Sequence, residues 1–99
     1  MTDRRKFERH GFEYPVNVST TTRKDRVGMA RDLSATGILF HSRSRFAVGE
    51  RVVVMFHTTR RLTSTIGHVV RSARIDNVEG MFTHATAVEF DVANLDLAA

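Results

Sequence analysis

Arg51-Val52-Val53-Val54-Met55-Phe56-His57 carries the clearest indication of the fold class. The apolar run within it has the length of a strand and is rich in β-branched valine, whose side chain packs well on a pleated surface. A continuous apolar run is usually covered on both faces. We therefore expect a strand over residues 51–57, placed centrally in a β-structure.

Shorter strand patterns lie on both sides of this run. The first of them alternates, with Tyr14, Val16 and Val18 on one face and polar residues on the other. No stretch shows the 3.6-residue apolar stripe of a long helix, and no repeat of 20–50 residues appears. The other expected strands cover residues 26–33, 38–42, 62–71 and 80–90, the last with Val88 and Phe90 facing inward.

About six short strands in one small chain favour closure of the sheet. A closed six-stranded antiparallel β-barrel leaves no exposed strand edges, so we expect an all-β barrel, with a β-sandwich as the alternative. A length of 99 residues corresponds to a single domain over residues 1–99. We divide it into an N-terminal arm over 1–11, a barrel over 12–90 and a short tail over 91–99.

Asp32-Leu33-Ser34-Ala35-Thr36-Gly37 separates two of the expected strands. A short segment that ends in glycine suggests a tight turn or a bulge, because Gly37 can adopt a positive φ without a Cβ penalty. Asp32 and Ser34 are then placed either to cap the turn through local amides or to face a ligand. In the later strand over 62–71, Gly67 suggests a bend.

The N-terminal arm is dense in arginine, with Arg4, Arg5 and Arg9. Each guanidinium can hold a phosphate or the edge of a guanine through two parallel hydrogen bonds. Like charges repel and few apolar anchors offset the entropy of ordering, so we expect the arm to be flexible without a ligand. The alternative interpretation is a solvated basic tail.

The composition narrows the class of protein. The formal net charge is +4, from 15 basic and 11 acidic side chains, and all the basic residues except Lys6 and Lys24 are arginine. The chain has no cysteine, which excludes disulfides and thiolate metal sites. No apolar run is long enough for a membrane span or suited to export, so we expect a cytoplasmic protein without membrane insertion.

Catalytic patterns are missing from the sequence. The five histidines are dispersed without metal-ligand spacing, and neither a G-x-S-x-G elbow nor a glycine-rich phosphate loop occurs. Paired carboxylates for acid–base chemistry are also absent. We therefore expect a protein that is not an enzyme and that needs neither a metal nor a cofactor.

Two motifs give the chain a resemblance to a known family. Arg4-Arg5-Lys6-Phe7-Glu8-Arg9 matches the R-R-x-x-x-R signature of PilZ domains, and Asp32-Leu33-Ser34-Ala35-Thr36-Gly37 matches their (D/N)-x-S-x-x-G signature. The segments 66–71 and 87–90 also resemble later strands of that family's barrel. The chain departs from the family at Ala87, where glycine is common.

The resemblance implies a bacterial receptor for cyclic di-GMP that relays the signal to an unidentified downstream protein. Arginine forks suit guanine O6/N7 and phosphate, a carboxylate can accept from the guanine amine edge, and a serine hydroxyl can bond a phosphate or base. We expect Arg4 to allow a second, intercalated ligand molecule. The expected ligand-binding residues are Arg4, Arg5, Arg9, Asp32, Ser34 and Gly37.

Two other classes of function compete with this one. A small basic barrel can bind RNA or single-stranded DNA, but such modules present surface aromatic rings, and the phenylalanines of this chain mostly fall on expected core positions. Nucleic acid is therefore an unlikely partner on sequence grounds. A PilZ-like barrel can also act as a protein-interaction module that binds no nucleotide.

Overall fold

The computed structural model describes residues 14–57, 62–75 and 80–92, and all regular structure within them is β-strand. The expected all-β class is therefore confirmed. The strands are β1 (Tyr14–Ser19), β2 (Arg26–Leu33), β3 (Gly37–Ser42), β4 (Arg51–His57), β5 (Leu62–Arg74) and β6 (His84–Phe90).

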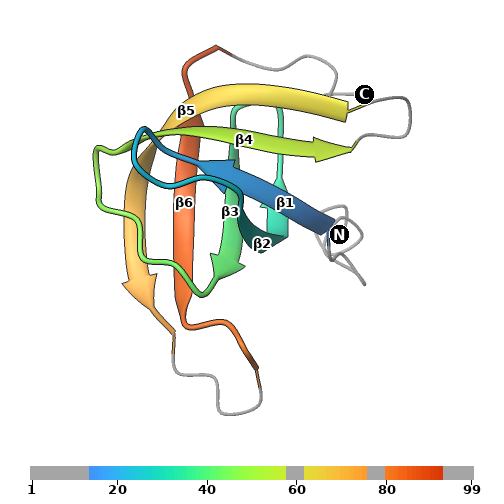
Figure 1. Ribbon diagram of the computed structural model, residues 1–99. Helices are drawn as coiled ribbons and strands as arrows, with labels where there is room; N and C mark the ends of the chain where they lie inside the picture. Colours follow the sequence, from blue (N-terminus) through green and yellow to red (C-terminus); the bar gives the residue numbers. More distant parts are fainter. Residues whose placement is uncertain (1–13, 58–61, 76–79, 93–99) are drawn as a thin grey trace, which may run out of the picture.

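The six strands close into a barrel in the order β1-β2-β3-β6-β5-β4, with β4 pairing back onto β1 (Figure 1). All neighbouring pairs are antiparallel. This confirms the six-stranded antiparallel barrel and excludes the sandwich alternative. The expected arm (1–11) and residues 93–99 of the expected tail (91–99) lie outside the described residues. No helix among the described residues is long and apolar enough to cross a membrane.

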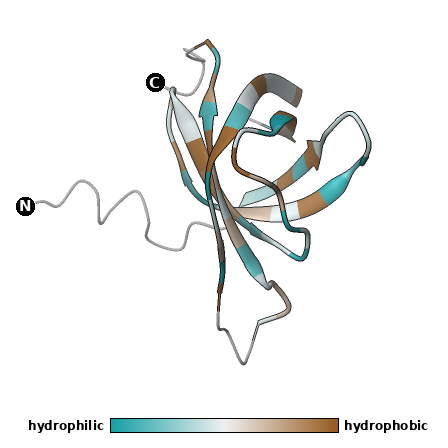
Figure 2. Cartoon of the chain, turned by 90° about the vertical axis from the view of Figure 1, so that its left-hand side faces the viewer, coloured by the Kyte–Doolittle hydropathy of each residue, from teal (hydrophilic) through white to brown (hydrophobic). Residues whose placement is uncertain are grey.

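The core is formed by one face of every strand, as Figure 2 illustrates by the alternation of hydrophobic and hydrophilic residues along the ribbons. Val16 and Val18 of β1 are buried, and Tyr14 packs against the same cluster, as the alternating pattern predicted. At the other end of the chain, Val88 and Phe90 of β6 also point into the core, as expected.

The central placement of residues 51–57 is wrong. In β4 the side chains of Val52, Val54 and Phe56 are buried, whereas Val53 and Met55 are only partly covered. A closed barrel has no central strand, because each strand has two neighbours and turns one face inward. The continuous apolar run therefore reflects an inward core face and an outward face that is apolar as well.

Two strand boundaries differ from the expectation. β5 runs to Arg74, beyond the predicted end at 71, and β6 begins at His84 instead of residue 80. The added residues of β5 pair with the beginning of β6, and Arg74 lies opposite His84. β5 is therefore extended by its pairing with β6, which the local sequence of residues 72–74 does not indicate.

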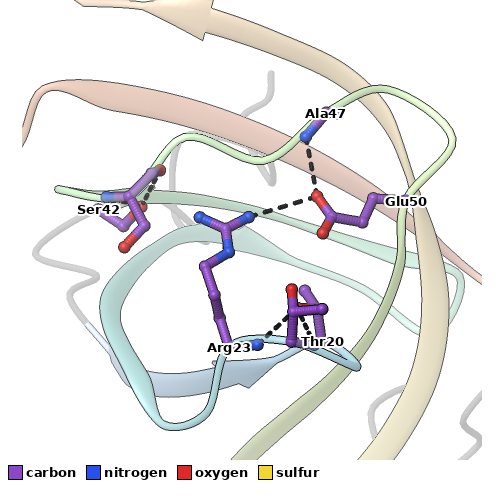
Figure 3. A network of polar contacts seen from close by, with 7 residues as sticks. Thr20, Arg23, Ser42, Ala47 and Glu50 are labelled. Atoms are coloured by element: carbon purple, nitrogen blue, oxygen red, sulfur yellow. Dashed lines mark hydrogen bonds and ion pairs between the residues drawn. The ribbon is translucent and has the colours of Figure 1, made fainter.

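Figure 3 shows the polar contacts of Arg23 and Glu50 at one end of the barrel. This end is closed by Phe46, from the connection between β3 and β4. Its ring is fully buried and meets Phe40 edge-on, with ring centroids 5.8 Å apart. The guanidinium of Arg23 lies 4.6 Å from the Phe46 centroid, and its Nη2 is 3.4 Å from Glu50 Oε1. The same Glu50 oxygen accepts a hydrogen bond from the backbone N–H of Ala47 at 3.0 Å. These contacts join the β1–β2 and β3–β4 connections over the core.

Candidate ligand-binding site

A β-bulge in β2 determines where Asp32 lies. Ala30 pairs with Phe40 and both are buried, whereas Asp32 pairs with Leu39, so Arg31 is an extra residue in the ladder. Strict alternation would have placed Asp32 on the buried side with Ala30. A bulge resets the alternation of its strand. As a result, Arg31 and Asp32 are both exposed on the outer surface of the barrel.

A second bulge lies in β5, three strands away from β2 along the same row of the sheet. Leu39 of β3 pairs with Ala87 of β6, and Ala87 pairs in turn with Arg71 of β5, where Val70 is the extra residue. Arg71 is therefore exposed on the same outer face as Asp32. Strands are about 4.8 Å apart, so the row places an acid and an arginine roughly 14 Å from each other across an apolar floor.

The turn between β2 and β3 is held by its own polar groups. The backbone N–H of Ser34 donates to Gly37 O at 3.0 Å, and the Thr36 N–H donates to Ser34 Oγ at 3.3 Å. Ser34 Oγ also lies 3.3 Å from Thr36 Oγ1. Thr36 O accepts a hydrogen bond from the Phe90 N–H at 2.9 Å, which ties the turn to the end of β6. Ser34 therefore forms the turn, and its exposed hydroxyl also lies beside the pocket described below.

Gly37 serves the turn for a reason other than the expected positive φ. Among the described residues, a positive φ occurs only at Asp25 and Gly49. A Cβ on Gly37 would lie 2.6 Å from the carbonyl oxygen of Val88. The glycine is thus required by the close approach of β3 to the β6 backbone.

These residues surround a shallow, open pocket of about 280 Å³. Asp32, Ser34 and Gly37, all predicted from the sequence, line it together. Sequence reasoning missed the residues of the paired strands that complete it, namely Ile38, Leu39, Ala87 and Val88. A carboxylate beside an apolar floor can accept hydrogen bonds from an amine or amide edge while a flat ring covers the floor.

The three arginines predicted as ligands, Arg4, Arg5 and Arg9, lie outside the described residues. Arg31 and Arg71 are exposed cations on the outer face of the barrel, and the bulge in β5 turns Arg71 outward. The exposure of Arg71 follows only from the register of the paired strands, because strict alternation after the buried Val69 would turn it inward. Within the described ranges, no cluster of three or more His, Cys, Asp or Glu side chains is arranged to hold a metal ion.

Arg31 also affects a neighbouring histidine. His41 lies on β3 two residues after Leu39 and is half-buried. Burial, and to a smaller degree the positive charge of Arg31, lower the pKa of His41 below its usual value of 6.5. This part of the outer face therefore holds a neutral imidazole at neutral pH, and its positive charge comes from arginine.

Comparison with known families agrees with this geometry. The PilZ domain family model matches residues 3–97, which is nearly the whole chain. The chain belongs to the PilZ domain family, a receptor family of the cyclic di-GMP-binding type whose members are generally non-catalytic adaptors. No curated protein and no solved structure gives a significant match.

Proposed function

We propose that this protein is a cyclic di-GMP receptor that binds its ligand between the arginine-rich arm and the β2–β3 turn. Membership of the PilZ family supports the ligand. The observation that carries the site is the bulge-directed exposure of Asp32 beside Ser34 and Gly37 over the pocket. The protein performs no catalysis in this proposal and acts in the cytoplasm.

Each side chain has a role that follows from the chemistry of the ligand. Arg5 and Arg9 supply forked donors to guanine O6/N7 and to phosphate. Asp32 accepts from the N1–H and N2–H₂ edge of a guanine, and Ser34 bonds a phosphate or base from the rim of the pocket. Arg4 stacks on and neutralises a second, intercalated ligand molecule, which gives two molecules per chain.

The ligand connects two segments that are far apart in the sequence. Binding orders the arm against the turn, and the joined surface is read by a downstream protein. Amide hydrogen exchange at Arg4 to His10 is expected to slow when cyclic di-GMP is saturating. Unchanged exchange there would exclude this order–disorder step.

Titration calorimetry with cyclic di-GMP tests the proposal. The wild type is expected to bind in the micromolar range or better, about −8 kcal/mol, with two ligands per chain. Asp32→Ala and Arg5→Ala should each reduce the binding free energy by about 1–3 kcal/mol. Arg26→Ala is the matched control, because Arg26 is exposed and does not line the pocket. A stoichiometry of one ligand per chain would exclude the second, intercalated ligand molecule. The absence of cyclic di-GMP binding would refute the proposed function.

The two competing functions make different predictions. Of the described phenylalanines, Phe40, Phe46, Phe56 and Phe90 are buried and Phe82 is half-buried, which disfavours a stacking surface for RNA or single-stranded DNA. Oligonucleotide binding with a steep salt dependence would support that alternative instead. A pure protein-interaction module would bind a partner but no guanine dinucleotide.

A further inference from the structure

At the end of the barrel away from the β2–β3 turn, β5 has an edge that no other described residue pairs with. β4 pairs with β5 as far as His68, and the β3–β4 connection continues the pairing through two hydrogen bonds at Val69. Ser72 to Arg74 pair only with β6. In Figure 1 this part of β5 and the beginning of β6 project below the other strands. Within the described ranges, nothing pairs with the second edge of Ser72 to Arg74.

A groove of about 600 Å³ lies between this projecting ribbon and the β3–β4 connection. Its positive side chains are Arg45 and Arg74, His84 of β6 lies opposite Arg74, and none of its described lining residues is acidic. The wall of the groove contains the fully buried Phe46, and its exposed apolar surface comes from Ala47 and from Val48, which is 66% exposed. The groove therefore combines unpaired backbone, forked cations and apolar surface.

We propose that this groove binds an extended, acidic segment of a partner protein, which adds a strand to β5 along Ser72 to Arg74. An exposed edge presents backbone donors and acceptors that a peptide main chain satisfies. Successive side chains of an added strand point to opposite faces, so glutamates on one face can contact Arg45 and Arg74. The guanidinium group of each arginine can hold a carboxylate through two parallel hydrogen bonds. Aliphatic side chains of the segment contact the apolar wall.

An acidic peptide fits this groove better than a nucleic acid does. The aromatic ring in the wall, Phe46, is fully buried and lies under Arg23, so it offers no face for base stacking. A nucleic acid also makes no use of an unpaired strand edge. The proposed ligand of the groove is therefore defined by two features, an extended backbone and carboxylate side chains.

The groove and the pocket at the β2–β3 turn lie at opposite ends of the same two strands. β3 runs from Gly37, which lines the pocket, to Ser42 near the groove, and β6 runs in the reverse direction from His84. A strand of this length spans about 17 Å. Both sites can therefore be occupied at once, and the peptide site does not depend on the proposed dinucleotide binding.

Fluorescence anisotropy with a labelled, acetylated hexapeptide of alternating valine and glutamate tests the proposal without cyclic di-GMP. The full-length chain is expected to bind this peptide. Arg74→Gln and Arg45→Gln should each weaken binding about tenfold, the loss expected for one charge-assisted hydrogen bond. Arg26→Gln, which removes the same charge outside the groove, should leave the affinity within about twofold. Equal losses in all three variants would overturn the site.

Two further probes separate strand addition from charge attraction in the unmodified protein. A hexapeptide with the same charges but N-methylated on alternate residues should bind at least about tenfold more weakly, because its main chain cannot pair with β5. Equal affinity for this peptide overturns strand addition. A dT oligonucleotide that competes as well as the peptide overturns the peptide assignment, as does the absence of peptide binding. The addition of saturating cyclic di-GMP is not expected to displace the peptide from the groove.

Discussion

Replacing Gly37 by alanine tests the physical argument for the β2–β3 turn. The added Cβ would lie 2.6 Å from the carbonyl oxygen of Val88, roughly 1 Å inside a favourable contact distance. The neighbour is backbone in a paired strand, so it cannot rotate away, and β3 must separate locally from β6. Overpacking of this kind costs about 1–3 kcal/mol.

Urea unfolding followed by far-ultraviolet circular dichroism measures this cost. With a urea dependence of about 1–2 kcal/mol per M, a loss of 2 kcal/mol lowers the midpoint by about 1–2 M. Cyclic di-GMP binding should weaken in the same variant, because Gly37 lines the pocket. An unfolding midpoint equal to that of the wild type would refute the close-approach argument.

Gly49 provides the matched control, since its φ is +91° and a Cβ there meets nothing within 4 Å. Alanine at Gly49 is strained by backbone conformation alone, and asparagine, which tolerates positive φ, should be milder than alanine. At Gly37 the order is reversed: asparagine should be at least as harmful as alanine, because the larger side chain meets the same oxygen. The two glycines therefore respond oppositely to the same pair of substitutions.

Three other predictions concern His41 and the closed end of the barrel. Because the folded pKa of His41 is lowered, the unfolded chain takes up its proton first as the pH falls below about 6.5, so folding stability decreases on acidification. His41→Gln should show a shallower decline in unfolding free energy between about pH 7 and pH 5; an unchanged slope would contradict this. Phe46→Ala should lower the unfolding free energy by about 3–5 kcal/mol, measured in urea, because the ring is fully buried. Arg23→Gln should cost no more than about 1 kcal/mol, since its ion pair with Glu50 is partly exposed, and a loss equal to that of Phe46→Ala would mean that the ion pair closes the barrel.

Local sequence patterns predicted most of the strands. The bounds of β2 and β4 and the inward faces of β1 and β6 agree with the expectation, because burial of one face imposes a two-residue period on the chain. The closed barrel was also predicted correctly, since six short strands need partners on both edges. The place of Phe46 in the core depends on two connections that meet at the end of the barrel, which a local sequence pattern does not show.

The candidate site could be predicted in part. The sequence located Asp32, Ser34 and Gly37 in one turn, and the structure places all three around one pocket. It could not predict that β6 supplies the opposite wall, because β3 and β6 are not neighbours in the chain. The reason given for Gly37 was incorrect, since close approach between strands leaves no trace in the local sequence.

By itself, the sequence determined the periodicity of the strands, the turn motif and the arginine-rich arm, because each depends on residues close together in the chain. The tertiary structure alone decided the direction of Asp32 and Arg71, since a bulge exists only relative to the partner strand. It also decided which residues form the floor of the pocket and which edge of β5 has no pairing strand among the described residues. Both depend on how residues far apart in the sequence register against each other when the sheet closes.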